Sequence, residues 1–182
     1  MKKLLILLFS LFTFVVKGQV NAVGIPFGMS YEKALILMQY KYGEPDRITM
    51  NNVFYNSFKL DNITYNSALF NFINGQFDCV MLVTNIKHSL SEEGAINAYK
   101  EAKELSEILK ETYTILDLVE LDADDEHFNP DTKIGLRRIF HGIPKNTPCI
   151  NGKLINEYEI NIYMMFTDND ISIIVRYSQD IN

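Results

Sequence analysis

The sequence predicts an α+β fold in two layers, with two helices packed on one face of a mainly antiparallel sheet of about seven strands. Three observations predict it. Two segments have the apolar spacing of amphipathic helices, runs of alternating apolar and polar residues follow each of them, and only short turns separate neighbouring runs. The order of one helix followed by several strands therefore occurs twice along the chain.

The first 18 residues have the composition of a cleavable secretory signal peptide. Lys2 and Lys3 precede an apolar run that a third lysine ends. The run is short for a membrane span, and Gly18 is a small residue of the kind that signal peptidase accepts before its cut. An uncleaved anchor is the alternative. We expect residues 1–18 to be removed and residues 19–182 to form a single periplasmic or secreted domain, with no transmembrane segment left after cleavage.

The first helix is expected at residues 31–42. Ser30 precedes it as an N-cap, whose hydroxyl can accept a hydrogen bond from an amide of the first turn. Gly43 suits the left-handed position that follows a last helical turn, and Pro45 prevents the helix from continuing.

Three strands are expected next, at residues 47–60, 63–73 and 77–86. Asn74 and Gly75 lie between the last two and form a strong type I′ hairpin signal. Because these strands are consecutive and joined by short turns, they should pair antiparallel.

A second helix is expected to begin near Ser89 or Ser91 and to end near Thr112. Ser89 together with Glu92 has the spacing of a capping box. Alanine and leucine residues recur at helical spacing along one face, whereas the opposite face is charged.

Four more strands are expected, at residues 114–121, 134–141, 155–167 and 171–178. The last two alternate most clearly, so that one set of side chains should meet the helices. The opposite set, which should lie on the second face of the sheet, includes Tyr163, Met165, Ile174 and Arg176. This mixture is typical of a recognition surface, and the alternatives are an ordinary half-polar face or a face under a further covering layer.

The start of the domain resembles two related groups of proteins. The stretch IPFGMSYE at residues 25–32, the helix after it, and the exit YGEPD at residues 42–46 are similar to the small outer-membrane assembly lipoproteins and to the β-lactamase inhibitor protein. Both groups bind proteins without catalysis, so the resemblance implies a binding domain, in the second case with two tandem helix-plus-sheet units. It covers the first third of the mature chain. The sequence departs from these groups because it has no lipid-bearing cysteine near the cut and no second glycine–proline exit.

The charge of the chain argues against nucleic acid as a partner. The 182 residues carry 17 Lys and Arg against 23 Asp and Glu, a net charge of −6. Removing the three lysines of the leader leaves 14 basic residues and a net charge of −9. Such a chain repels phosphates, and it has no basic stripe with interleaved aromatic residues.

The two cysteines, Cys79 and Cys149, are candidates for a disulfide in an exported protein. In the chain-entropy model a bridge across so long a loop stabilises by ~4 kcal/mol. The alternative is two unpaired thiols, with Cys79 buried in a strand.

Two groups of residues are candidates for chemistry. His141 and Cys149 flank a loop rich in glycine and proline and would form a thiolate nucleophile if they met. An acidic loop concentrates oxygen ligands of the kind that calcium prefers, namely Asp122, Asp124, Asp125 and Glu126. That loop does not fit an EF-hand, and a solvated acidic loop is the alternative. No other cofactor is expected.

The sequence therefore favours an exported, non-enzymatic binding module that recognises a protein or envelope component through the second face of its sheet. Two alternatives remain open: a secreted hydrolase that uses the loop of Cys149 and His141, and a structural envelope protein.

Overall fold

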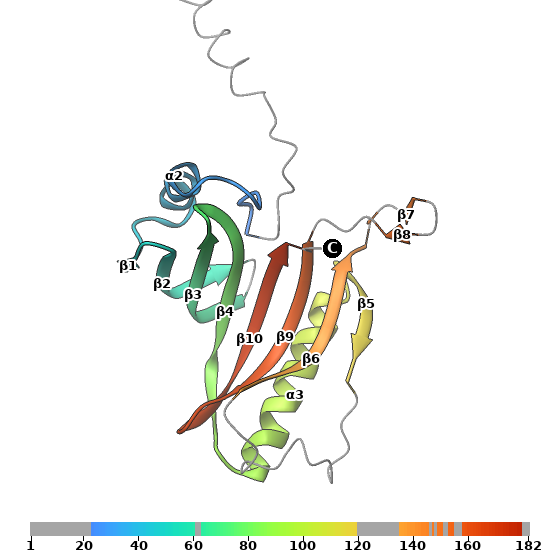
Figure 1. The fold of residues 1–182 in the computed structure, drawn as a ribbon. Coiled ribbons are helices and arrows are strands. Elements are labelled where there is room, and N and C mark those ends of the chain that lie inside the picture. The colour runs from blue at the N-terminus through green and yellow to red at the C-terminus, as the bar shows by residue number, and fades with distance from the viewer. Residues whose placement is uncertain are drawn as a thin grey trace, which may run out of the picture.

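The computed structural model describes residues 23–60, 63–119, 135–145, 147, 149–150, 153–154 and 158–179. In that part of the chain, two helices accompany an eight-stranded sheet whose paired strands are all antiparallel (Figure 1). The predicted α+β class is confirmed. The predicted leader, residues 1–18, lies outside the described residues.

The first half of the fold is a helix followed by a meander of four strands. Its elements are α2 (Tyr31–Tyr42), β1 (Arg47–Ile48), β2 (Asn52–Leu60), β3 (Ile63–Ile73) and β4 (Gln76–Ser89).

The second half repeats this order and adds a small hairpin. Its elements are α3 (Glu92–Leu109), β5 (Tyr113–Leu118), β6 (Gly135–Pro144), β7 (Cys149–Ile150), β8 (Lys153–Leu154), β9 (Tyr158–Phe166) and β10 (Asp170–Gln179). Strands β7 and β8 pair only with each other, and both lie before residue 155, where the next strand was expected to begin.

The two meanders meet at the centre of the sheet. The strand order is β1-β2-β3-β4-β10-β9-β6-β5, so the last strand of each half pairs with the last strand of the other. This seam runs from the pair Cys79–Ser178 to the pair Ser89–Asp170. Figure 1 shows α2 beside the β1–β4 half, whereas α3 lies along β10, β9 and β6.

The long first strand that the sequence predicted, at 47–60, is divided in the structure. Strands β1 and β2 form a tight hairpin in which Ile48 is the partner of Val53 and the amide of Thr49 donates to the carbonyl of Asn52. The sheet therefore has eight strands instead of about seven. The short turn within an otherwise strand-like run contains no glycine or proline to indicate it.

The helix starts depart in detail from the expected capping. Ser30 occupies the N-cap of α2, but its hydroxyl makes no capping bond. The first amide of the helix, that of Tyr31, donates to the carbonyl of Gly75. The cap of α3 is Ser91, which accepts from the amide of Gly94 at 3.1 Å, in place of a capping box at Ser89. Gly43 follows the last residue of α2 with the positive φ of 85° that was expected, but its ψ of −169° lies outside the left-handed helical region.

One hydrophobic core joins both helices to one face of the sheet. Its densest part is an aromatic cluster around Phe70, whose ring centroid lies 5.7 Å from Phe58, 5.8 Å from Tyr55 and 5.9 Å from Phe77. The alternate residues of β9 and β10 that the sequence assigned to the helix side are buried in the same core, from Ile160 to Phe166 and from Ile171 to Tyr177. Within the described residues, no helix is both long enough and apolar enough to cross a membrane.

Candidate functional site

The sheet has a second face, turned away from the helices. We call it the open face, because neither of the two described helices packs on it (Figure 1). Its side chains come from the strand positions that alternate with the core residues. In strands β4, β10, β9 and β6 they include Cys79, Met81, Arg138, His141, Glu159, Asn161, Tyr163, Met165, Ser172, Ile174, Arg176 and Ser178.

The four residues predicted for this face come together on strands β9 and β10. Ile174 is the register partner of Tyr163, while Met165 and Arg176 lie diagonally to either side of this pair. Tyr163, Met165 and Arg176 are half-buried, whereas Ile174 is only 5% exposed. Ile174 therefore differs from the accessible residue expected from the sequence. It lies between Val83 and Tyr163 on the two neighbouring strands, which enclose it.

Strand β6 extends this patch. Leu136 is the register partner of Met165 and is 52% exposed, and Arg138 is the partner of Tyr163. Arg138 lies 3.4 Å from Asp117, and both side chains are about half exposed. An exposed leucine beside Met165 and Tyr163 makes the patch more apolar than the sequence alone indicated.

At the seam, Arg176 lies against Cys79. The guanidinium and the thiol interact electrostatically, and Asp78 and Tyr163 contribute further charge interactions. Burial is the largest effect on the thiol and raises its pKa to about 11, although Arg176 opposes the shift. The Cys79 thiol is therefore protonated at neutral pH and is a poor nucleophile.

Towards the β6 end of the face, Glu159 joins three side chains. Its Oε1 accepts from Asn161 Nδ2 at 3.0 Å and from Ser178 Oγ at 3.2 Å, and its Oε2 lies 3.0 Å from His141 Nε2. The carboxylate stands between the serine and the histidine. In a nucleophilic triad the histidine has to contact the hydroxyl itself, so this arrangement orders the four side chains without activating Ser178.

Two buried polar atoms near the centre of the face lack a hydrogen-bond partner among the described residues. They are the Oδ1 of Asn161 and the Nε of Arg176, and these two residues are register partners. Buried polar atoms are nearly always paired in native proteins. The Oδ1 of Asn161 can still accept a hydrogen bond, and the Nε of Arg176 can still donate one. A bound partner or water molecules could supply these bonds after a small movement of the two side chains.

Several predicted residues cannot be compared with the structure. The acidic residues Asp122, Asp124, Asp125 and Glu126 lie outside the described residues, as does the side chain of Cys149. Cys79 carries a free, buried thiol, and its pairing with Cys149 stays a prediction.

The pairing of Cys149 with His141 also stays a prediction, because the side chain of Cys149 lies outside the described residues. His141 itself contacts Glu159. Across the described ranges, no three His, Cys, Asp or Glu side chains gather as metal ligands would.

The Glu159 cluster was missed at the sequence level. Glu159, Asn161 and Tyr163 are each two residues apart on one strand, as are Arg176 and Ser178 on the next. Residues two apart in a strand share a face, so the sequence indicated that these side chains lie on the same side of the sheet. The position of His141 beside Asn161 depends on the pairing of β6 with β9, which are far apart in sequence.

Comparison with known proteins gives no relative for the chain: no protein-family model, no curated protein and no solved structure matches it. The function therefore has to be inferred from the chain's own residues. The resemblance of its first third to two protein-binding groups stays a prediction.

Proposed function

We propose that this chain is an exported, non-enzymatic binding module that recognises a protein or envelope component through the open face of its sheet. One observation carries the proposal. Tyr163, Met165 and Arg176 lie together with Leu136 on neighbouring strands, on the face that the two described helices leave uncovered.

The composition of this patch supports recognition. Tyrosine and arginine are enriched among the residues that dominate binding energy, because each combines a large contact area with directed hydrogen bonds. Methionine adapts its shape to a partner surface. Leu136, at 52% exposure, leaves apolar area in water that a partner would cover.

The polar groups of the face favour binding over catalysis. The Cys79 thiol is protonated at neutral pH, since burial raises its pKa to about 11. Glu159 accepts from Ser178 and also contacts His141, so that neither has the partner a nucleophilic mechanism requires. Groups held in this way can orient a bound surface through fixed hydrogen bonds.

Export is inferred from the leader at residues 1–18, and a mature chain that begins at Gln19 by mass spectrometry is its direct test. The resemblance to protein-binding groups agrees with this location. The topology supports the tandem form of that resemblance, because each helix is followed by a four-stranded meander in the same sheet.

The binding proposal is tested by capture from envelope extract with the purified chain and two tyrosine variants. Tyr163→Ala removes the central aromatic side chain of the patch. Tyr40→Ala is the matched control, because Tyr40 is 87% exposed on α2 and does not belong to the open face.

We expect the wild type and Tyr40→Ala to retain one stoichiometric partner, and Tyr163→Ala to bind it at least about tenfold more weakly, as for an interface hot spot. Equal capture by all three proteins, or no partner for any of them, would overturn the proposal.

A further inference from the structure

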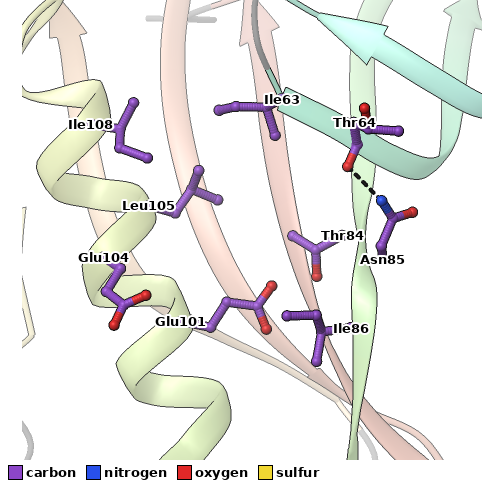
Figure 2. A pocket seen from close by; sticks show the side chains of 9 residues that line it. All are labelled: Ile63, Thr64, Thr84, Asn85, Ile86, Glu101, Glu104, Leu105 and Ile108. Carbon is purple, nitrogen blue, oxygen red and sulfur yellow. Dashed lines mark hydrogen bonds between the residues drawn. The ribbon is translucent and has the colours of Figure 1, made fainter.

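A groove of about 400 Å³ lies on the helix side of the sheet, apart from the open face (Figure 2). One wall is the stripe of α3 that contains Glu101, Glu104, Leu105 and Ile108. These positions follow helical spacing, with Glu101 and Leu105 reaching towards the sheet and Glu104 and Ile108 exposed at the rim. The other wall is formed by the start of β3 and the part of β4 around Thr84.

The walls of the groove are mainly apolar and partly open to water. Ile86 on β4 is 55% exposed and Ile108 on α3 is 57% exposed, and they stand on opposite sides of the groove. Ile63 and Leu105 lie between them. A chain laid between these walls would remove apolar surface from water on both sides.

Two carboxylates give the groove negative charge. Glu101 lies 2.6 Å from His88 Nε2, and its side chain extends into the groove in Figure 2. Glu104, one helical turn further, is exposed and forms no salt bridge with any described residue. The site therefore favours a cation over an anion.

Thr84 has a buried hydroxyl that is not satisfied. The residue is 8% exposed, and its Oγ1 has no hydrogen-bond partner among the described residues. In Figure 2 its side chain stands beside that of Glu101 and above that of Ile86. Such a hydroxyl is available to accept a hydrogen bond from a bound donor.

The edge of β4 beside the groove has no strand partner in the described part of the chain. Strand β3 accompanies β4 only as far as Thr84, the partner of Tyr65, and Asn85 then caps the start of β3 through a 2.8 Å bond to the carbonyl of Thr64. Beyond this point, residues 87–89 pair with β10 on one side alone within the described register, whereas Asn85 and Ile86 fall at an irregularity of the β4–β10 ladder. The other edge presents backbone groups to which a further strand could bond.

We propose that this groove binds an extended peptide segment of a partner protein, which adds as a strand to β4 along residues 85–89. Residues two apart in such a strand face the same side, so two of its side chains enter the groove. One is apolar and packs on Leu105 and Ile108. The other is a lysine or arginine whose cation meets Glu101 and Glu104 and donates to Thr84.

The net charge of the chain agrees with this occupant. At −6 the protein attracts cationic segments and would speed their encounter with the groove. The inference goes beyond the binding function of the open face, because the two surfaces lie on opposite sides of the sheet and share no residue.

The test uses a fluorescein-labelled heptapeptide, Ser-Thr-Leu-Thr-Lys-Thr-Ser, in fluorescence anisotropy with the purified chain. Its leucine and lysine are two residues apart, as the groove requires. We expect a dissociation constant on the order of 10–100 µM, because a short flexible peptide loses entropy when it is ordered. The same peptide with glutamate in place of lysine should bind at least about tenfold more weakly, because like charges meet in the groove.

Two double variants compare the groove carboxylates with others of equal charge. Glu101→Gln with Glu104→Gln should weaken the heptapeptide at least about fivefold, whereas Glu32→Gln with Glu44→Gln on and beside α2 should leave it unchanged. An equal loss in both would mean non-specific attraction and would overturn the inference. Equal binding of the lysine and glutamate peptides would do the same.

Backbone pairing has its own readout, which does not depend on any variant that might fail to fold. The heptapeptide at saturation should slow amide hydrogen exchange within residues 85–89, because added strand bonds protect those amides. Saturation without such protection would overturn strand addition. Tyr163→Ala should leave heptapeptide affinity unchanged, so that failure of this inference and failure of the open-face function are distinguishable.

Discussion

The two faces of the sheet are built from the same strands but from different chemistry. On the helix side, aromatic rings pack around Phe70 and exclude water. On the open face, the same strands carry Arg176 against a buried thiol, and Glu159 hydrogen-bonded to Asn161 and Ser178 and in contact with His141. They also carry the Oδ1 of Asn161 and the Nε of Arg176, which have no hydrogen-bond partner among the described residues. A stable fold requires the apolar packing of the helix side. Stability alone does not require the polar groups of the open face.

The difference separates residues that maintain the fold from residues that are free to serve recognition. Apolar burial on the helix side dominates stability, because each large side chain removed from water contributes several times more than a surface pair. Changes on the open face should therefore alter binding more than folding.

The largest expected effect comes from the centre of the core. Phe70→Ala should lower the free energy of unfolding by about 3–5 kcal/mol, because it removes a fully buried ring and leaves a cavity. Leu69→Ala, its neighbour on the open face, is half-buried and should cost about 1 kcal/mol. Urea denaturation followed by circular dichroism measures both. Equal losses would mean that the two faces contribute alike and would end the comparison.

A smaller effect is expected from the polar cluster of the open face. Glu159→Gln should cost about 1–2 kcal/mol in the same denaturation experiment, since glutamine offers one acceptor oxygen where glutamate offers two and leaves a neighbour unpaired. Glu44→Gln is the control, because Glu44 is exposed and bonds only to Gln39 in the described structure. If Glu159→Gln costs no more than this control, the cluster is not an ordered unit.

The smallest effect concerns the ion pair at the end of the seam. Lys87 Nζ donates to Asp170 Oδ2 at 2.8 Å, and this bond lowers the pKa of Asp170 below its usual value of 3.8. A carboxyl whose pKa is lower in the folded state stabilises above its unfolded pKa and loses that contribution as the pH falls through the folded one. Because Lys87 is 62% exposed, we expect under about 1 kcal/mol.

Asp170→Asn therefore should be slightly less stable than the wild type at pH 7, and the gap should close as the pH falls below about 3.8. Urea denaturation at a series of pH values checks this. A gap that widens on acidification would contradict the assigned direction of the pKa.

Local signals carried most of the fold prediction. The Asn74–Gly75 hairpin, helix α2 and the alternation of β9 and β10 were each predicted from neighbouring residues, and each is present. The division of the strand at 47–60 was missed, because the turn between β1 and β2 contains only ordinary polar and apolar residues. The pairing of β4 with β10 joins the two halves at the centre of the sheet. These strands are about 80 residues apart in the chain, and no pattern among neighbouring residues indicates that they pair.

The candidate site was predicted only in part, because local signals indicate which face a residue lies on but not which strand lies beside it. Alternation alone assigned Tyr163, Met165, Ile174 and Arg176 to one face, and the register agrees. It could not predict that Ile174 is enclosed, that Leu136 adjoins Met165, or that His141 meets Glu159, since each depends on which strand lies alongside. Long-range strand order sets these contacts.

The most direct test of the open face as the binding surface is site-specific photocrosslinking. A benzophenone side chain is introduced at position 163 in one protein and at position 40 in another, and each is irradiated in envelope extract. We predict one discrete crosslinked partner from position 163 and none from position 40, where the native tyrosine is 87% exposed but lies on α2. A partner crosslinked from position 40 alone, or from neither position, would contradict the account.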